Sequence, residues 1–167
     1  MKKLSPKGQR WLKCFHIFFS CMWVGAGVCL VFMQFALQAM DAKTIHGIDV
    51  SMKFIDDFII IPGALGSLLT GLVYSLFTNW GFFKHNWITI KWVINVAGII
   101  FGTFWLGPWI NSLPPISAAL GLGALSDTIY IHNKMMNTWL GSIQVFTLVF
   151  AVFISVLKPW KKQRKAL

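Results

Sequence analysis

The sequence predicts an all-α, polytopic membrane protein, a four-transmembrane-helix bundle with both termini in the cytoplasm. Three observations lead to this prediction. Hydrophobic residues make up 56% of the 167 residues and charged residues only 12%, about half of the charged fraction of a typical soluble domain. Long stretches of the chain carry no charge. Most basic residues lie before the first of these stretches, after the last, or around the connection between the second and the third. The excess apolar surface is therefore expected to face lipid.

Each of four stretches without Asp, Glu, Lys or Arg can supply the roughly 20 apolar residues that a helix needs to cross about 30 Å of hydrocarbon. None of them alternates polar with apolar residues as a barrel strand would, so helices are the expected spanning form. The chain is predicted to be a single domain, residues 1–167. Its spans are predicted at about 11–40, 58–78, 87–109 and 136–157.

The connections between the spans differ in length. Pro114 and Pro115 are predicted to end the third helix before a connection rich in Gly and Ala, residues 116–125. Asp127 resembles a helix start, so the fourth helix is expected to begin outside the bilayer, and the second helix is expected to project in the same way from Asp49 onward.

The distribution of charge predicts the orientation. Of the 15 Lys and Arg residues, all but three precede the first span, follow the last span or lie beside the connection between the second and third spans. All five acidic residues lie in the other two connections, so the positive-inside rule places both termini in the cytoplasm. The basic ends are expected to contact anionic lipid. No aromatic or glycine pattern accompanies them, so no nucleic-acid partner is predicted.

Small residues indicate where the helices touch, because close packing in lipid needs Gly, Ala, Ser or Thr at the contact. Gly63, Ser67 and Thr70, together with Gly66 and Gly71, mark such a face on the second span. The other small residues predicted to face the interior are Gly25, Gly27, Gly98, Gly102 and Gly141. The cysteines Cys14, Cys21 and Cys29 all fall inside the first span, and no structural disulfide is expected.

Polar groups inside a membrane are the first candidates for function. His16 shares one face of the first span with Ser20, Trp23 and Gln34, and it is expected to point into the bundle near the cytoplasmic surface. Polar residues of the other spans are expected at a similar depth. The predicted polar cluster consists of His16, Thr70, Tyr74, Lys91 and Asn95, with Ser155 nearby.

Three interpretations of His16 stay open. It is a candidate ligand of a b-type haem, which requires a second histidine at matching depth, and His85 is the candidate on the cytoplasmic side. It is also a candidate proton relay or substrate contact. Finally, it is a candidate structural residue that hydrogen-bonds a hydroxyl or carbonyl group and holds the bundle together.

A second group of candidate ligands lies on the outer side. His132 and Met136 share one helix face, and with His46 they form a candidate copper site, because imidazole and thioether ligands suit Cu(I). Methionine also fills gaps in apolar cores, which is the alternative interpretation. His46 and His132 are in addition candidate ligands of an outer haem. Copper is less favoured than haem as a cofactor.

The chain carries none of the soluble-enzyme motifs that bind nucleotide phosphates, activate a serine or hold zinc. Every acidic side chain is predicted on the outer side, which excludes a carboxylate base or a carboxylate-ligated metal at the inner surface. Whether the protein is an enzyme stays open, with a redox role as the candidate.

Two segments carry a resemblance to a known family. Residues 12–25, LKCFHIFFSCMWVG, and residues 61–72, IPGALGSLLTGL, followed by NWGFF, are similar to the bacterial integral membrane family described as domain of unknown function 2269. The chain shows a weaker likeness to the copper-resistance D-type membrane proteins and to four-helix b-type cytochromes, but it lacks their paired intramembrane histidines. The resemblance implies a multi-span protein of the bacterial inner membrane and no particular activity.

The sequence leaves three candidate functions. The first is an integral inner-membrane protein whose polar cluster around His16 binds or transfers a small species, with protons, electrons and metal ions as candidates. The second is a redox subunit that binds b-type haem. The third is a structural or assembly partner of a larger membrane complex, or of a second copy of the chain.

Overall fold

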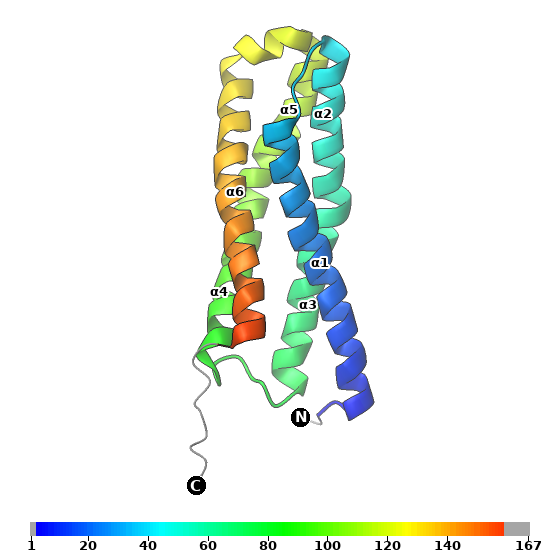
Figure 1. Cartoon of the computed structure of the whole chain (residues 1–167), viewed down its shortest axis with the longest axis vertical. Coiled ribbons are helices and arrows are strands. Elements are labelled where there is room, and N and C mark those ends of the chain that lie inside the picture. The colour runs from blue at the N-terminus through cyan, green and yellow to red at the C-terminus, as the bar shows by residue number, and fades with distance from the viewer. Residues whose placement is uncertain (1–2, 159–167) are drawn as a thin grey trace.

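The computed structural model describes residues 3–158, and these residues form helices joined by short connections, with no strand among them (Figure 1). Four helical segments run side by side along the long axis of the molecule, and each is long and apolar enough to cross a membrane. The prediction of an all-α protein with four such helical segments is confirmed.

The four segments contain six α-helices, two π-helical turns and one 3-10 helix within the described residues. The first is α1 (Pro6–Ala36), and the last is α6 (Thr128–Leu157). The second segment consists of α2 (Ala42–Ile55), the π-helical η1 (Asp56–Ile60) and α3 (Ile61–Phe77). The third consists of α4 (Asn86–Phe101), the π-helical η2 (Gly102–Leu106), α5 (Gly107–Leu120) and the 3-10 helix η3 (Gly121–Ser126).

The molecule has two distinct ends (Figure 1). One end carries the start of α1, the end of α6 and the connection between α3 and α4, and is called the terminal end below. The opposite end carries the connection between α1 and α2 together with η3, and is called the distal end.

Side-chain caps fix where three helices begin. Ser5 accepts a hydrogen bond from the Gly8 amide at 3.2 Å, and Asp41 accepts one from the Thr44 amide at 2.7 Å. The hydrogen bond from the Thr44 amide lowers the pKa of the Asp41 carboxyl. Asp127 caps α6 in the same way, so the predicted helix start at this residue is confirmed.

The third segment corrects a prediction made from the sequence. Pro114 and Pro115 do not end a helix, because α5 continues through both to Leu120. A proline removes one backbone donor and strains the preceding turn, but Leu113 and Pro114 are buried in the packing at the distal end, which outweighs that cost. The helix ends instead at Gly121, whose φ of 53° suits glycine.

Two other prolines follow the π-helical turns. Pro62 and Pro108 each occupy the second position of the helix after such a turn. In η2 the Gly107 amide donates to the carbonyl of Gly102, five residues earlier, and η1 closes with the equivalent bond. The wider π turn accommodates a proline inside a long helix, because it loosens the backbone where the amide donor is missing.

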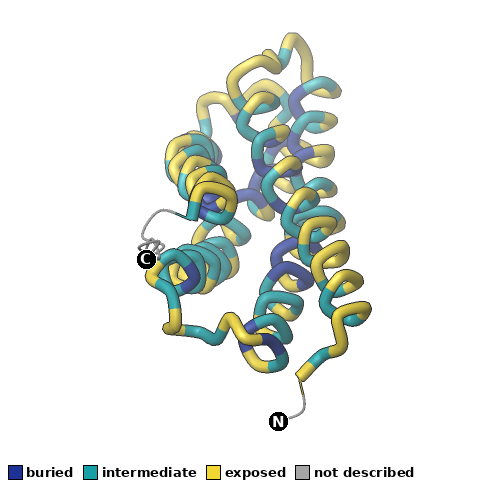
Figure 2. The backbone as a smooth tube through the Cα atoms, turned by 60° about the horizontal axis from the view of Figure 1, so that its bottom comes forward, coloured by how far each residue is buried: buried dark blue, intermediate teal, exposed yellow. Residues whose placement is uncertain are grey.

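The interior contains three clusters of buried residues, and many exposed residues are large and apolar. Figure 2 shows how buried and exposed residues are distributed along the backbone. The clusters centre on Tyr130 near the distal end, on Met52 in the middle and on Trp23 closest to the terminal end. Large apolar side chains such as Phe32 and Phe146 are about 70% exposed. Such an apolar surface is expected for helices that face lipid rather than water.

The helices α1 and α3 form the closest pair. A Cβ atom on Gly63 would lie 2.8 Å from the backbone nitrogen of Trp23, and one on Gly66 would overlap the ring of Phe19. Both glycines lie on the small-residue face predicted for the second span, as does the buried Ser67. Gly25 is not at a close helix contact, because a Cβ atom there would meet nothing within 4 Å, but it lines the cleft between α1, α3, α4 and α6.

Candidate functional site

A cleft of about 960 Å³ lies in the half of the molecule toward the terminal end, between α1, α3, α4 and α6. Here α1 and α3 form one pair, and α4 and α6 form the other (Figure 1). The buried cluster around Trp23 and Leu148 adjoins the cleft, and both residues also line it. The polar residues that line the cleft are His16, Ser20, Ser67, Tyr74, Ser75, Asn95 and Ser155.

His16 is tied to α3 by a hydrogen bond. Its Nδ1 lies 2.8 Å from Oγ1 of Thr70, and the Thr70 hydroxyl itself lies 2.6 Å from the Gly66 carbonyl. The Thr70 hydroxyl donates its one hydrogen to that carbonyl, so its oxygen accepts from His16. Neutral His16 therefore carries its hydrogen on Nδ1, and its Nε2 is left as an acceptor.

The other hydroxyl groups around His16 also have partners. Oγ of Ser20 lies 3.0 Å from Oγ of Ser67, which adds a second polar link between α1 and α3. The indole of Trp92 donates to Ser75 at 3.1 Å and links α4 to α3. The rings of His16 and Tyr74 pack edge to face, with their centroids 5.8 Å apart. These contacts hold the polar floor of the cleft, formed by His16, Ser20, Ser67 and Ser75, in place.

Among the residues that the structure describes, three lysines line the cleft, from three parts of the chain. Lys13 lies on α1, Lys91 lies on α4, and Lys158 follows α6. Nζ of Lys158 lies over the rings of Trp80 and Trp87, at 5.4 Å and 5.8 Å. None of the five acidic residues of the chain lines the cleft. The cleft is therefore a positively charged environment.

The cleft is open along the seam between α1 and α6. Ile17 and Cys21 on α1 line it and are exposed, and the same holds for Val152 and Val156 on α6. If α1 and α6 packed against each other along this side, these residues would be buried. Their exposure shows that the cleft is open between the two helices. The open side runs along the apolar face of the molecule, and the lysines lie toward its terminal end.

The structure brings together the polar cluster that the sequence predicted. His16, Tyr74, Lys91 and Asn95 all line the one cleft, and Thr70 holds His16 from behind. His85 does not line the cleft. It precedes α4, and the centroid of its ring lies 5.7 Å from that of Trp80 and 6.2 Å from that of Trp87.

The candidate metal ligands lie near the distal end. His46 on α2 has its Nδ1 3.4 Å from Oγ of Ser117 on α5, whereas His132 on α6 is exposed. Met136, one turn after His132, is half-buried. Across residues 3–158, no three His, Cys, Asp or Glu side chains gather into a metal-binding group.

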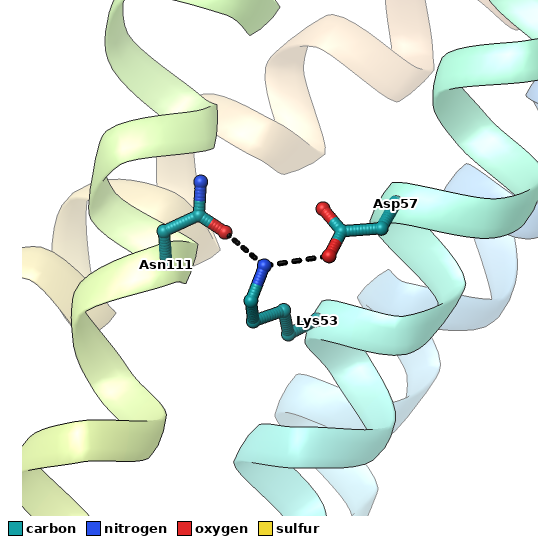
Figure 3. Close-up of polar contacts among 3 residues, drawn as sticks. All are labelled: Lys53, Asp57 and Asn111. Carbon is teal, nitrogen blue, oxygen red and sulfur yellow. Dashed lines mark hydrogen bonds and ion pairs between the residues drawn. The ribbon is translucent and has the colours of Figure 1, made fainter.

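Two polar networks near the distal end were not predicted from the sequence. Asp49 is fully buried on α2 and accepts hydrogen bonds from the Tyr130 hydroxyl at 3.0 Å and 3.1 Å. Nζ of Lys53 lies 2.5 Å from Oδ2 of Asp57 and 2.7 Å from Oδ1 of Asn111, which joins α2 to η1 and α5 (Figure 3). Both networks connect helices that form the distal half of the bundle.

A signal for the buried Asp49 was present in the sequence. Ile45 and Met52, four residues before it and three after it, are among the most buried residues of the protein. This spacing places Asp49 in the middle of the apolar face of α2. An acidic residue at such a position needs a hydrogen-bond donor from a neighbouring helix.

A third network lies between the two ends. Nε2 of Gln34 donates to Oδ1 of Asn137 at 3.1 Å, and Nδ2 of Asn137 donates to the carbonyl of Leu106 in η2 at 3.1 Å. Gln144, two turns further along α6, donates to the Gly98 carbonyl at 3.2 Å. These amides join α1, α6 and the third segment.

A scan against protein-family models, a search of curated proteins and a search of solved structures each found no match to this chain. The resemblance to the family described as domain of unknown function 2269 therefore stays a prediction from the sequence.

Proposed function

We propose that this chain is an integral protein of the bacterial inner membrane that binds a small amphipathic molecule, which enters the cleft around His16 from the lipid bilayer. One observation carries the proposal. The cleft has hydrogen-bonding groups on its floor and an open side bordered by exposed apolar residues of α1 and α6. A molecule with a polar head and an apolar tail matches both parts.

The charge distribution supports an orientation with the terminal end in the cytoplasm. The basic residues are concentrated near the chain ends, and none of the acidic residues lines the cleft. Trp80 and Trp87, beside the connection from α3 to α4, suit the level of the lipid head groups. His16 lies ten residues into α1, about 15 Å along the helix. The cleft then opens toward the inner leaflet.

The electrostatics of the cleft disfavour a metal ion or a proton as the species that it binds, and favour the amphipathic molecule. Hard metal ions are bound by carboxylates, and proton relays in membranes commonly include Asp or Glu, whereas this cleft is lined by three lysines and no acid among the described residues. The assembly role is less favoured for a separate reason. Gly98 and Gly102 on the third segment already face Gln144 of α6, so this GxxxG face is covered within the chain.

The test is to identify what the protein carries. The full chain is purified in a mild detergent, extracted with organic solvent and analysed by mass spectrometry, and its visible spectrum is recorded with and without dithionite. A stoichiometric amphipathic compound is expected, without a Soret band. A haem spectrum would replace the proposal with the cytochrome interpretation.

Two tryptophan variants show whether the compound occupies the cleft. Ser155→Trp fills the cleft at a residue that lines it, and Phe153→Trp, on the same helix, changes a side chain that is 59% exposed and does not line it. Loss of the compound is expected in Ser155→Trp and not in Phe153→Trp. Equal retention in both variants would place the compound outside the cleft and contradict the proposal.

A further inference from the structure

We propose that the cleft selects a molecule whose head group is an anion, a carboxylate or a phosphate, and that Lys91 is the residue that recognises this charge. The inference rests on the proposed function, because it specifies the head group of the molecule bound in that cleft. It depends on the position of the three lysines and on the groups that surround them.

The first step concerns the balance of charge. Lys13, Lys91 and Lys158 reach the same cleft from α1, from α4 and from the residue after α6. All five acidic residues of the chain are among the described residues, and none lines the cleft. Three ammonium groups that share one cleft repel each other unless a negative charge lies between them. The missing charge is expected to come from the ligand.

The second step concerns the depth of Lys91. This residue is half-buried, five positions into α4, or about 7 Å along the helix. It makes no ion pair or hydrogen bond with another residue of the described part of the chain. A partly buried ammonium group is costly unless it is paired. An anionic head group would satisfy it.

The third step concerns the groups beside Lys91. Asn95, one turn further along α4, also lines the cleft and offers an amide donor. Trp23 and Leu148, which belong to one buried cluster, form an apolar wall of the same cleft. A carboxylate or phosphate near Lys91 would thus place its tail toward the apolar wall and the open seam. Free phosphate would fill only the polar part.

Surface lysines attract anionic lipids in general, so a control must separate the cleft from the surface. Lys84 provides it. This residue lies in the connection before α4, seven positions from Lys91, and it is exposed and does not line the cleft. Lys84→Gln removes the same charge as Lys91→Gln from the same end of the molecule.

The experiment measures binding to the full chain in detergent by native mass spectrometry, with four probes whose hydrocarbon chains have the same number of carbons. Palmitate and palmitoyl lysophosphatidate carry the two acidic head groups, palmitoyl lysophosphatidylcholine is zwitterionic, and hexadecanol is neutral. Inorganic phosphate tests a head group without a tail. The acids are expected to bind at least tenfold more tightly than the other probes. Whichever acid binds more tightly identifies the head group.

The variants then test Lys91. Lys91→Gln is expected to weaken binding of the acids about tenfold and to leave hexadecanol binding unchanged, whereas Lys84→Gln changes neither more than twofold. Lys91→Arg keeps the charge and is expected to retain most of the affinity. If Lys91→Gln does not fold, Lys158→Gln, at the mouth of the cleft, is expected to give a smaller loss of the same selectivity.

The failure of this inference differs from a failure of the proposed function. Equal binding of the acids, the zwitterion and the alcohol, all abolished by Ser155→Trp, would overturn the anion selectivity and leave the cleft as a binding site. Equal losses in Lys91→Gln and Lys84→Gln would assign the selectivity to the surface and also overturn the inference. Binding of none of the probes would contradict the inference.

Discussion

Nδ1 of His16 lies 2.8 Å from Oγ1 of Thr70, although the two residues are 54 positions apart in the chain. This bond joins α1 to α3 beside the cleft, and it fixes the ring so that Nε2 is the acceptor of the neutral histidine. One threonine therefore determines both the orientation and the tautomer of the histidine at the centre of the predicted polar cluster.

Thr70→Val is expected to lower the free energy of unfolding by about 1 kcal/mol, because it removes the acceptor of His16 and keeps the shape of the side chain. Thr70→Ser keeps the hydroxyl and is expected to remain close to the wild type. Thermal unfolding in detergent measures the stability, and imidazole ¹⁵N shifts report the tautomer. An unchanged Nδ1–H tautomer in Thr70→Val would contradict the role given to Thr70.

Tyr130→Phe is expected to lower the free energy of unfolding by about 1–3 kcal/mol, because the fully buried Asp49 would lose the hydroxyl that donates to both of its oxygens. The only other tyrosine of the chain is the matched control. Tyr74 is half-buried, and its hydroxyl makes one long bond of 3.4 Å to the Gln9 carbonyl. A loss in Tyr74→Phe as large as in Tyr130→Phe would show that the Asp49 contact is unimportant.

The sequence predicted the helical segments and the composition of the cleft better than it predicted the distal half. Uncharged stretches identify the helices directly, and helical spacing with the order of the spans places His16, Lys91 and Asn95 at one depth. The role of Asp49 was missed, because an acidic residue near a span end was interpreted only as an indicator of topology.

The width of the cleft and its open seam could not be predicted from the sequence. Both depend on how far the α1 and α3 pair lies from the α4 and α6 pair, and periodicity reports only which face of a helix is apolar. The course of α5 through Pro114 was missed for a related reason. The helix continues because tertiary packing around Leu113 outweighs the local preference of proline.

Gly63→Ala and Gly47→Ala are expected to change stability in opposite directions. A Cβ atom on Gly63 would lie 2.8 Å from the backbone nitrogen of Trp23, so α1 and α3 must separate, and a loss of about 1–3 kcal/mol is expected. Gly47 lies in the exposed part of α2, where a Cβ atom meets nothing within 4 Å. Alanine there is expected to add about 0.5–1 kcal/mol, because it favours the helix.

Chemical unfolding of the two glycine variants in detergent measures the difference. A stabilising Gly63→Ala would mean that α1 and α3 pack less closely than the structure has them, and the links from His16 to Thr70 and from Ser20 to Ser67 would then lengthen as well.

The contact between Gln34 and Asn137 allows a double-mutant cycle in the middle of the bundle. Asn137→Leu removes the acceptor of Gln34 and the donor to the Leu106 carbonyl, and a loss of about 1–3 kcal/mol is expected. Gln34→Leu is expected to cost less, because Oε1 of Gln34 is buried and has no hydrogen-bond partner among residues 3–158, so its removal is favourable.

The double variant is expected to be more stable than the sum of the single losses predicts, by about 0.5–1.5 kcal/mol, since both partners of one bond are then absent. Unfolding free energies of the four proteins in one detergent give this coupling directly. Gln144→Leu is a control on the same helix, because Gln144 bonds the Gly98 carbonyl and not Gln34. Combining Gln144→Leu with Gln34→Leu should give additive losses. A strong coupling there, with none between Gln34 and Asn137, would show that α1 contacts α6 through a different residue.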